Sequence, residues 1–287
     1  MNKRATLLLL LAAGLSAGGP SAATVFSFSD PGELKEHFLV RKLPIVGSKP
    51  EYPEPFDWTY EWTGTTGFGG TPGAVVRDVN NGDVYSPALY YKDETFNPRE
   101  GGAPLRISVC FQAEAGTKKS PSRTIVCFTD KNSQNLSSHN YPKMGARVFK
   151  NNTGEFEPGE FTLQLLATET NNVHPNNRVV SFGRFALADG HWYELTFEVS
   201  RTGAKTFSAS GELRDCGLDG KARPTVVSSG SATFTNNTLG GDLTWVAGVM
   251  IQNDGGGAVA LDNFSVGYAA APESVQAKAG AASAVSE

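Results

Sequence analysis

The sequence lacks a basic stripe and, beyond its N-terminus, any apolar run of 18 residues. The formal net charge is only −4, and lysine and arginine are not gathered along any segment, so nucleic acid is not an expected partner. Without an apolar run of that length no membrane span is expected. Helical periodicity is also missing outside residues 31–38, which leaves strands and turns as the expected elements.

The sequence also lacks the short motifs that mark common active sites. There is no G-x-S-x-G, no P-loop and no dinucleotide fingerprint. The four histidines have no metal-ligand spacing, so neither a zinc site nor a histidine base is supported. No catalytic residue is therefore predicted; whether the chain is an enzyme stays open, and a non-catalytic role is favoured.

The N-terminus has the pattern of a secretory signal peptide. Lys3 and Arg4 form a positive start, a leucine-rich core follows, and small residues precede a cleavage site expected after Ala23. Residues 1–23 are therefore expected to be removed, and the mature chain is expected to be secreted, to an extracellular or periplasmic place that is oxidising. The Ala/Ser-rich stretch 269–287 is expected to be a disordered tail.

The clearest element is a β-hairpin within residues 189–215. Apolar and polar side chains alternate from Trp192 to Ser200, a Gly-containing loop follows, and the alternation resumes from Phe207 to Leu213. Each strand has one apolar face that needs a second sheet to cover it. Similar short strands, with 32 glycines and 16 prolines between and within them, recur along the chain. We expect an all-β protein over residues 24–268: a single antiparallel jelly-roll β-sandwich of roughly a dozen strands.

Cys110 and Cys127 are the candidate disulfide pair. Residues 105–113 and 123–130 are predicted to be consecutive strands of one hairpin, whose register places the two cysteines directly opposite each other. Directly opposed Cβ atoms lie about 5 Å apart, and a disulfide needs about 4 Å, so either a bridge or two buried thiols would fit. Cys216 has no predicted partner.

Three stretches resemble a known family: DGHWYELTF from Asp189, SGEL from Ser210 and VALDNFSV from Val259. They look like concanavalin A-like lectin/glucanase domains, the laminin-G-type jelly roll, and the resemblance covers about residues 25–268. The closing strand also resembles that of galactose-binding-like sandwiches. The resemblance implies a jelly-roll fold and a glycan or polysaccharide as partner, but its motifs are structural, and the superfamily includes lectins, carbohydrate-binding modules, hydrolases and lyases. The short motifs of alginate-type lyases, R-x-E-x-R and Q-x-H, are absent.

An aromatic stripe is the candidate binding site. Trp58, Tyr60 and Trp62 share one face of a predicted strand with Phe56. Sugars present C–H faces that stack on flat rings, so exposed members of this stripe would form a sugar platform. An alternating aromatic strand is also typical of a core, and both interpretations stay open.

A structural calcium ion is the candidate cofactor. Asp262, in Leu-Asp-Asn-Phe, resembles a position that binds calcium in some sugar-binding jelly rolls. Asp30 is the predicted partner, because first and last strands are often neighbours in such sandwiches. Carboxylate oxygens are ligands that calcium prefers, but Asx-turns without metal explain the same residues.

The alternative to a lectin-like module is an enzyme that acts on polysaccharides. Glu194 and Glu198 share a strand face, but four residues along a strand separate them by about 13 Å. That exceeds the roughly 5 Å of a retaining pair, and no third carboxylate completes the motif. The hypotheses are thus a secreted, non-catalytic carbohydrate-binding module, a hydrolase or lyase with catalytic residues dispersed over several strands, or a structural envelope or matrix protein.

Overall fold

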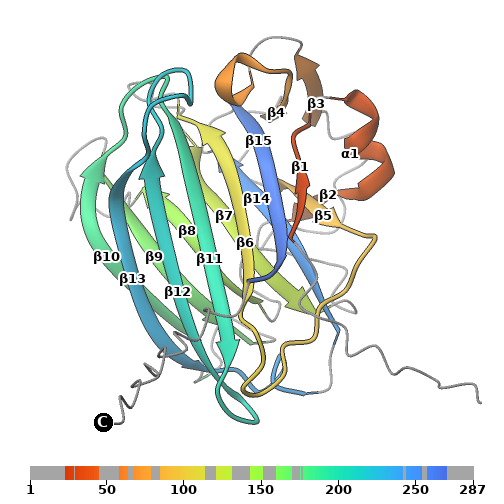
Figure 1. Cartoon of the computed structure of the whole chain (residues 1–287), viewed down its shortest axis with the longest axis vertical. Helices are drawn as coiled ribbons and strands as arrows, with labels where there is room; N and C mark the ends of the chain where they lie inside the picture. Colours follow the sequence, from red (N-terminus) through yellow and green to blue (C-terminus); the bar gives the residue numbers. More distant parts are fainter. Residues whose placement is uncertain are drawn as a thin grey trace, which may run out of the picture.

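All strand pairs in the described part of the chain are antiparallel except one isolated bridge, and the strands form two sheets stacked face to face (Figure 1). The computed structural model describes residues 23–28, 30–44, 58–63, 67–78, 85–113, 121–130, 143–150, 160–169, 175, 177–241, 244–253 and 257–269. The chain is an all-β sandwich, as predicted from the sequence.

The two sheets differ in size. Sheet A has, in spatial order, β13 (Thr225–Thr235), β12 (Thr206–Asp215), β11 (Trp192–Arg201), β6 (Leu105–Gln112), β15 (Gly257–Tyr268), β4 (Gly73–Asp78) and β3 (Trp58–Thr63), with β1 (Thr24–Phe26) beside β15. Sheet B has β10 (Arg178–Ala186), β9 (Glu160–Thr168), β8 (Lys143–Lys150), β7 (Pro121–Asp130), β14 (Trp245–Asn253), β5 (Tyr85–Tyr91) and β2 (Phe38–Pro44). A short helix α1 (Pro31–His37) and a 3₁₀ turn η1 (Phe68–Gly70) complete the described elements.

The predicted hairpin within residues 189–215 is confirmed. β11 and β12 pair from Tyr193 opposite Asp215 to Arg201 opposite Phe207. Leu195 and Phe197 are buried between the sheets, whereas the side chains between them point outward, as the period of two requires. The outward positions of β11 therefore lie on the outer face of sheet A.

The main core fills the space between the two sheets. Phe197 of sheet A and Phe128 of sheet B lie with their ring centroids 6.3 Å apart, which is ordinary aromatic packing distance. Gly211 lets the sheets approach each other, because a Cβ there would lie 2.7 Å from Leu165. The apolar face of each sheet is thus buried against the other, which is what the alternation in the sequence demands.

Helix α1 begins as the sequence predicts. Asp30 is the N-cap, and its carboxylate accepts a hydrogen bond from Gly32 N over 2.7 Å. Pro31 occupies the first turn, where its missing N–H is no loss. Leu34 is fully buried in the main core and fixes the helix against the sandwich. No helix in the described residues is long and apolar enough to cross a membrane.

The predicted hairpin that would join Cys110 to Cys127 is wrong. β6 pairs with β11 and β15 in sheet A, and β7 pairs with β8 and β14 in sheet B. Cys110 and Cys127 belong to small apolar clusters on the two opposite outer faces, with the main core between them. All three cysteines are free and buried. Two strands with the same alternation can form a hairpin or face each other across a sandwich, and here the chain crosses to the other sheet.

Candidate functional site

A groove of about 810 Å³ lies on the outer face of sheet A. We call it the sheet A groove. Its floor comes from outward side chains of β6, β11 and β15, and its sides come from β1, the η1 turn and the chain just before β13. The residues that line it include Val25, Phe68, Arg106, Ser108, Cys110, Glu194, Glu198, Cys216, Pro224, Asn263 and Tyr268.

The sheet A groove continues sideways across the next two strands. A shallower hollow of about 400 Å³ lies over β11, β12 and β13 and shares Arg106 and Glu198 with the groove. Besides these two residues it is lined by the charged side chains of Glu212 and Arg214 and by small residues, among them Ser210 and Ser229. The two hollows together extend from β1 to β13 across the face of the sheet.

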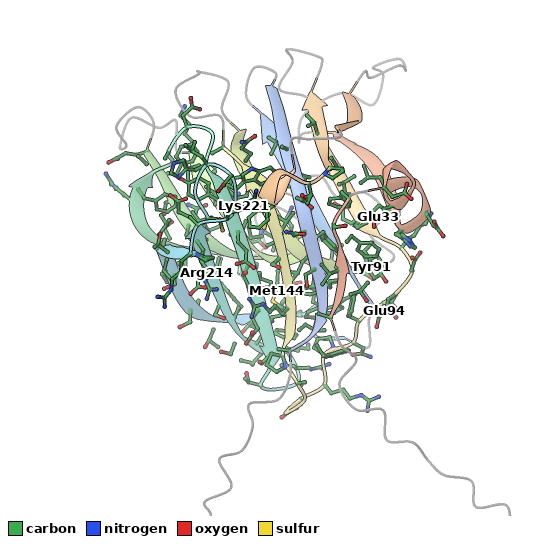
Figure 2. All side chains as sticks on the ribbon, turned by 45° about the horizontal axis from the view of Figure 1, so that its top comes forward. Glu33, Tyr91, Glu94, Met144, Arg214 and Lys221 are labelled. Carbon is green, nitrogen blue, oxygen red and sulfur yellow. The ribbon has the colours of Figure 1, made fainter. Side chains whose placement is uncertain are left out.

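One end of the groove is covered by the η1 turn. Gly69 N donates a hydrogen bond to Asp219 O over 2.8 Å, so the turn is fastened to the loop that follows β12. Phe68 meets Trp192 edge to face, with ring centroids 5.8 Å apart. We call residues 67–71 together with 219–221 the bridge; Figure 2 labels Lys221, whose Nζ lies near Gly70. The bridge covers Trp192 and closes the face of the sheet at that level.

Asp262 holds the bridge from below. Its carboxylate accepts hydrogen bonds from Phe68 N over 2.7 Å, from Asn263 N over 2.6 Å and, more weakly, from Thr71 Oγ1 over 3.5 Å. The side chain is fully buried, and burial raises its pKa to about 6 although these hydrogen bonds pull it down; the charge of Glu33 raises it further. Asp262 is therefore an anchor for the loop that shapes the groove.

Charged groups meet in the middle of the groove. Register places Glu198 opposite Arg106 on β6, and Glu194 opposite Cys110. In the described part of the chain the side chains of Glu194, Glu198 and Arg106 have no hydrogen-bond or ion-pair partner. Three charged groups that are not committed to neighbours can contact a polar ligand.

Glu212 adds a third carboxylate that the sequence alone did not show. It lies on β12 opposite Thr196, and so stands diagonal to both Glu194 and Glu198. Diagonal neighbours have Cβ atoms about 7–8 Å apart or somewhat less. The Glu212 carboxylate is paired with Arg214 Nε. The carboxylates come together across strands, which a search along a single strand for E-x-D-x-E cannot detect.

The predicted aromatic platform lies at the edge of sheet A. β3, which carries Trp58, Tyr60 and Trp62, pairs with β4, and β4 lies between it and β15. The side chains of these three residues lie outside the described part of the structure, so the platform stays a prediction. The aromatic rings that do line the groove belong to Phe68 and Tyr268.

The predicted calcium ligands have different surroundings. The Asp30 carboxylate is engaged as the cap of α1 and is exposed, whereas Asp262 is buried. The acid whose charge acts on Asp262 is Glu33, in the first turn of the helix, which Figure 2 labels. Within the described ranges, no group of three or more histidine, cysteine, aspartate or glutamate side chains is placed to hold a metal.

The described strands define an all-β sandwich of two antiparallel sheets, with a groove on the outer face of sheet A. No protein-family model and no curated protein matches the sequence. Peanut lectin matches with a TM-score of 0.45 and 12% identity over 81% of this chain and 97% of the lectin. Lectin II from Ulex europaeus matches with a TM-score of 0.43 and 11% identity over 80% and 97%. An alginate lyase from Pseudomonas aeruginosa matches with a TM-score of 0.41 and 14% identity over 69% and 83%.

Proposed function

We propose that this is a secreted protein that binds a carbohydrate in the sheet A groove. The observation that carries the proposal is the set of uncommitted charged groups Glu194, Glu198 and Arg106 beside the ring of Phe68 in a groove of about 810 Å³. Sugar hydroxyls pair well with carboxylate and guanidinium groups, and the C–H face of a sugar packs on an aromatic ring. The concanavalin A-like resemblance of the sequence supports a glycan as the ligand.

The test is a glycan array followed by calorimetric titration, with the chain from Thr24 onward. Glu198→Gln removes the carboxylate shared by the groove and its side hollow, and we expect at least a tenfold loss of affinity, since a hydrogen bond to a charged group contributes about 1.5–3 kcal/mol. Glu160→Gln makes the same chemical change on sheet B and serves as the matched control. Binding to no glycan, or equal binding by both variants, would overturn the proposal.

We infer that Glu33, rather than Asp30, would be the partner of Asp262 in a structural calcium site. Glu33 Oε2 is buried and has no hydrogen-bond partner, and burial raises the pKa of this carboxyl. A buried carboxylate oxygen without a partner is a hard ligand of the kind that calcium takes. Asp262 and Glu33 would supply ligands to the ion, and its charge would offset the repulsion between these two acids.

Calcium binding is tested by thermal unfolding with calcium and with a chelator. An ion present at 100 times its dissociation constant stabilises the folded state by about 2.7 kcal/mol. We expect calcium to raise the melting temperature of the native protein and to have no effect on Glu33→Gln. Asp30→Ser keeps a helix cap and serves as control. A calcium shift that Asp30→Ser removes and Glu33→Gln keeps would return the site to Asp30.

Glu212 favours glycoside hydrolysis as a second candidate function. Inverting glycosidases hold two carboxyl groups about 6.5–9.5 Å apart, and the diagonal placement of Glu198 and Glu212 is compatible with that range. Release of reducing sugar from soluble polysaccharides, with the anomer of the product followed by NMR, tests the idea. Hydrolysis that is lost in both Glu198→Gln and Glu212→Gln, with inverted product, would make the protein an enzyme; binding without hydrolysis would leave it a lectin-like module.

A further inference from the structure

We propose that the sheet A groove recognises the end of a glycan chain rather than its interior, and that Phe68 is the wall at which the terminal sugar stops. This inference rests on the proposed carbohydrate binding and adds the part of the glycan that is read. It follows from where the groove is closed, how firmly the closure is held, and where the groove stays open.

The closure is visible in the burial of side chains that point away from the core. Trp192, Cys110 and Cys216 form a separate cluster on the outer face of sheet A, outside the main core, and they are 2%, 5% and 1% exposed. Side chains on the solvent-facing side of an antiparallel sheet are normally accessible to water. Their burial therefore requires a cover, and the ring of Phe68, set edge-on against Trp192, belongs to that cluster. The floor of the groove ends at Cys110 and Cys216, where this cover begins.

The cover is packed too tightly for a sugar chain to pass under it. A Cβ on Gly220 would lie 2.7 Å from the Phe68 ring, so the loop after β12 touches the ring directly. A Cβ on Gly67 would lie 2.6 Å from Asp262 Oδ2 and 2.5 Å from Thr71 O, so the turn also sits directly on its anchor. With the hydrogen bond from Gly69 N to Asp219 O, the bridge is attached to the sheet on both sides.

The open direction lies across the strands toward β13. The side hollow continues the groove from Glu198 over β12 to Ser229 and Ser231 on β13. From β11 to β13 it spans two strand spacings, roughly 10 Å, which is about the length of two sugar rings. A volume of about 810 Å³ in the groove itself lies within the range of pockets that enclose a small ligand. A chain can thus place its last sugars against Phe68 and leave over β13.

The two modes of recognition differ in stoichiometry. If the protein recognises chain ends, one protein molecule binds to each glycan chain, whatever the length of the chain. If it recognises the interior, the number of protein molecules bound per glycan chain grows with the length of the chain. The probes are cello-, xylo-, manno-, laminari- and chito-tetraoses and longer oligosaccharides or soluble polysaccharides of the same series. Calorimetry and analytical ultracentrifugation give the number of protein molecules bound per chain.

We expect one molecule per chain at every length, and an affinity that stops rising beyond about four sugars. A bulky dye coupled to the bound end should lower the affinity of the native protein at least tenfold, and the dye on the other end should not. Phe68→Ala removes the wall and should restore binding of the blocked end. Phe149→Ala, a half-buried ring on sheet B, is the matched control, and thermal unfolding shows that both variants fold.

The outcomes separate this inference from the proposed function. A stoichiometry that grows with chain length, or equal tolerance of the dye at both ends, would overturn chain-end recognition and leave carbohydrate binding intact. Failure of Phe68→Ala to admit the blocked end, in a folded variant that still binds the free tetraose, would show that Phe68 is not the wall. Absence of binding to every probe would overturn both.

Discussion

Gly230 on β13 lies beneath an aromatic ring, and this contact determines the sign of a single substitution. Its backbone is not in the left-handed region, so alanine can adopt the same conformation. On backbone grounds alone, alanine should stabilise an extended strand by about 0.5–1 kcal/mol relative to glycine. A Cβ at this position, however, would lie 2.1, 2.3 and 2.4 Å from three atoms of the Phe182 ring. The ring must therefore move.

Moving the ring should cost more than the backbone gains. Forcing an extra methyl group into a packed site typically costs 1–3 kcal/mol, so we expect Gly230→Ala to destabilise the protein by about 1–2 kcal/mol. For a domain of this size that lowers the melting temperature by roughly 2–8 °C. Differential scanning calorimetry measures the change. Gly203→Ala, whose Cβ would make only ordinary contacts at 3.6 Å, should be close to neutral.

The decisive result comes from the background Phe182→Ala. With the ring removed, the contact that opposes alanine is gone, and Gly230→Ala should now stabilise by about 0.5–1 kcal/mol. The sign of the same substitution is therefore expected to reverse between the two backgrounds. If Gly230→Ala stabilises the native protein, or destabilises both backgrounds equally, the packing of Phe182 on Gly230 does not control this edge of the sandwich.

Three further predictions concern buried polar groups. Burial raises the pKa of Asp262 to about 6, above its ordinary value of 3.8, so its contribution to stability is full below about pH 4 and is lost as the pH rises through 6. With a chelator present, Asp262→Asn should therefore make the denaturation midpoint depend less on pH between pH 4 and 7. An unchanged pH dependence in this variant would contradict the argument. All three cysteines are buried, and burial raises the pKa of Cys127 to about 11, so a thiol reagent should react slowly with native protein and count three thiols after unfolding without reductant; a count of one would reveal a disulfide. Glu169 is fully buried and accepts hydrogen bonds from three donors of the turn that begins at Asn236. Glu169→Gln should therefore lower the free energy of unfolding, measured by chemical denaturation, by about 2–4 kcal/mol. A decrease of less than about 0.5 kcal/mol would show that the turn does not need this carboxylate.

The hairpin of β11 and β12 could be predicted because its information is local. Alternation from Trp192 to Ser200 sets which side chains face inward, and the short loop leaves only one way for the strands to pair. β6 and β7 have an equally clear alternation, but it is the same for two strands in one sheet and for two strands that face each other across a core. The partner of a strand that leaves its sheet is set by packing over the whole sandwich, which no local pattern records.

The site could be predicted only in part for a related reason. Glu194 and Glu198 were visible on one strand, but Glu212 joins them through strand pairing and Arg106 through a strand some 90 residues earlier. Phe68 was missed because it lies in a stretch of glycine and threonine that reads simply as a loop. The available signal was the single large aromatic residue in this loop. An apolar ring exposed to water is unfavourable, so Phe68 could have been expected to pack against another part of the protein.

The strand arrangement explains why a loop should be anchored at Asp262 rather than elsewhere. β15 pairs with β4 up to Leu261 and with β1 only from Phe264, so one edge of β15 changes partner at residues 262 and 263. Asn263 adopts a left-handed conformation with φ 47°, which lets the chain kink at this exchange, and asparagine tolerates it better than most residues. The gap between β4 and β1 leaves room for a turn, and a buried carboxylate there needs donors, which Phe68 N and Thr71 Oγ1 supply. The bridge is thus a consequence of the change of partner along β15. Residues 262 and 263, where β15 changes partner from β4 to β1, also determine where the groove is closed.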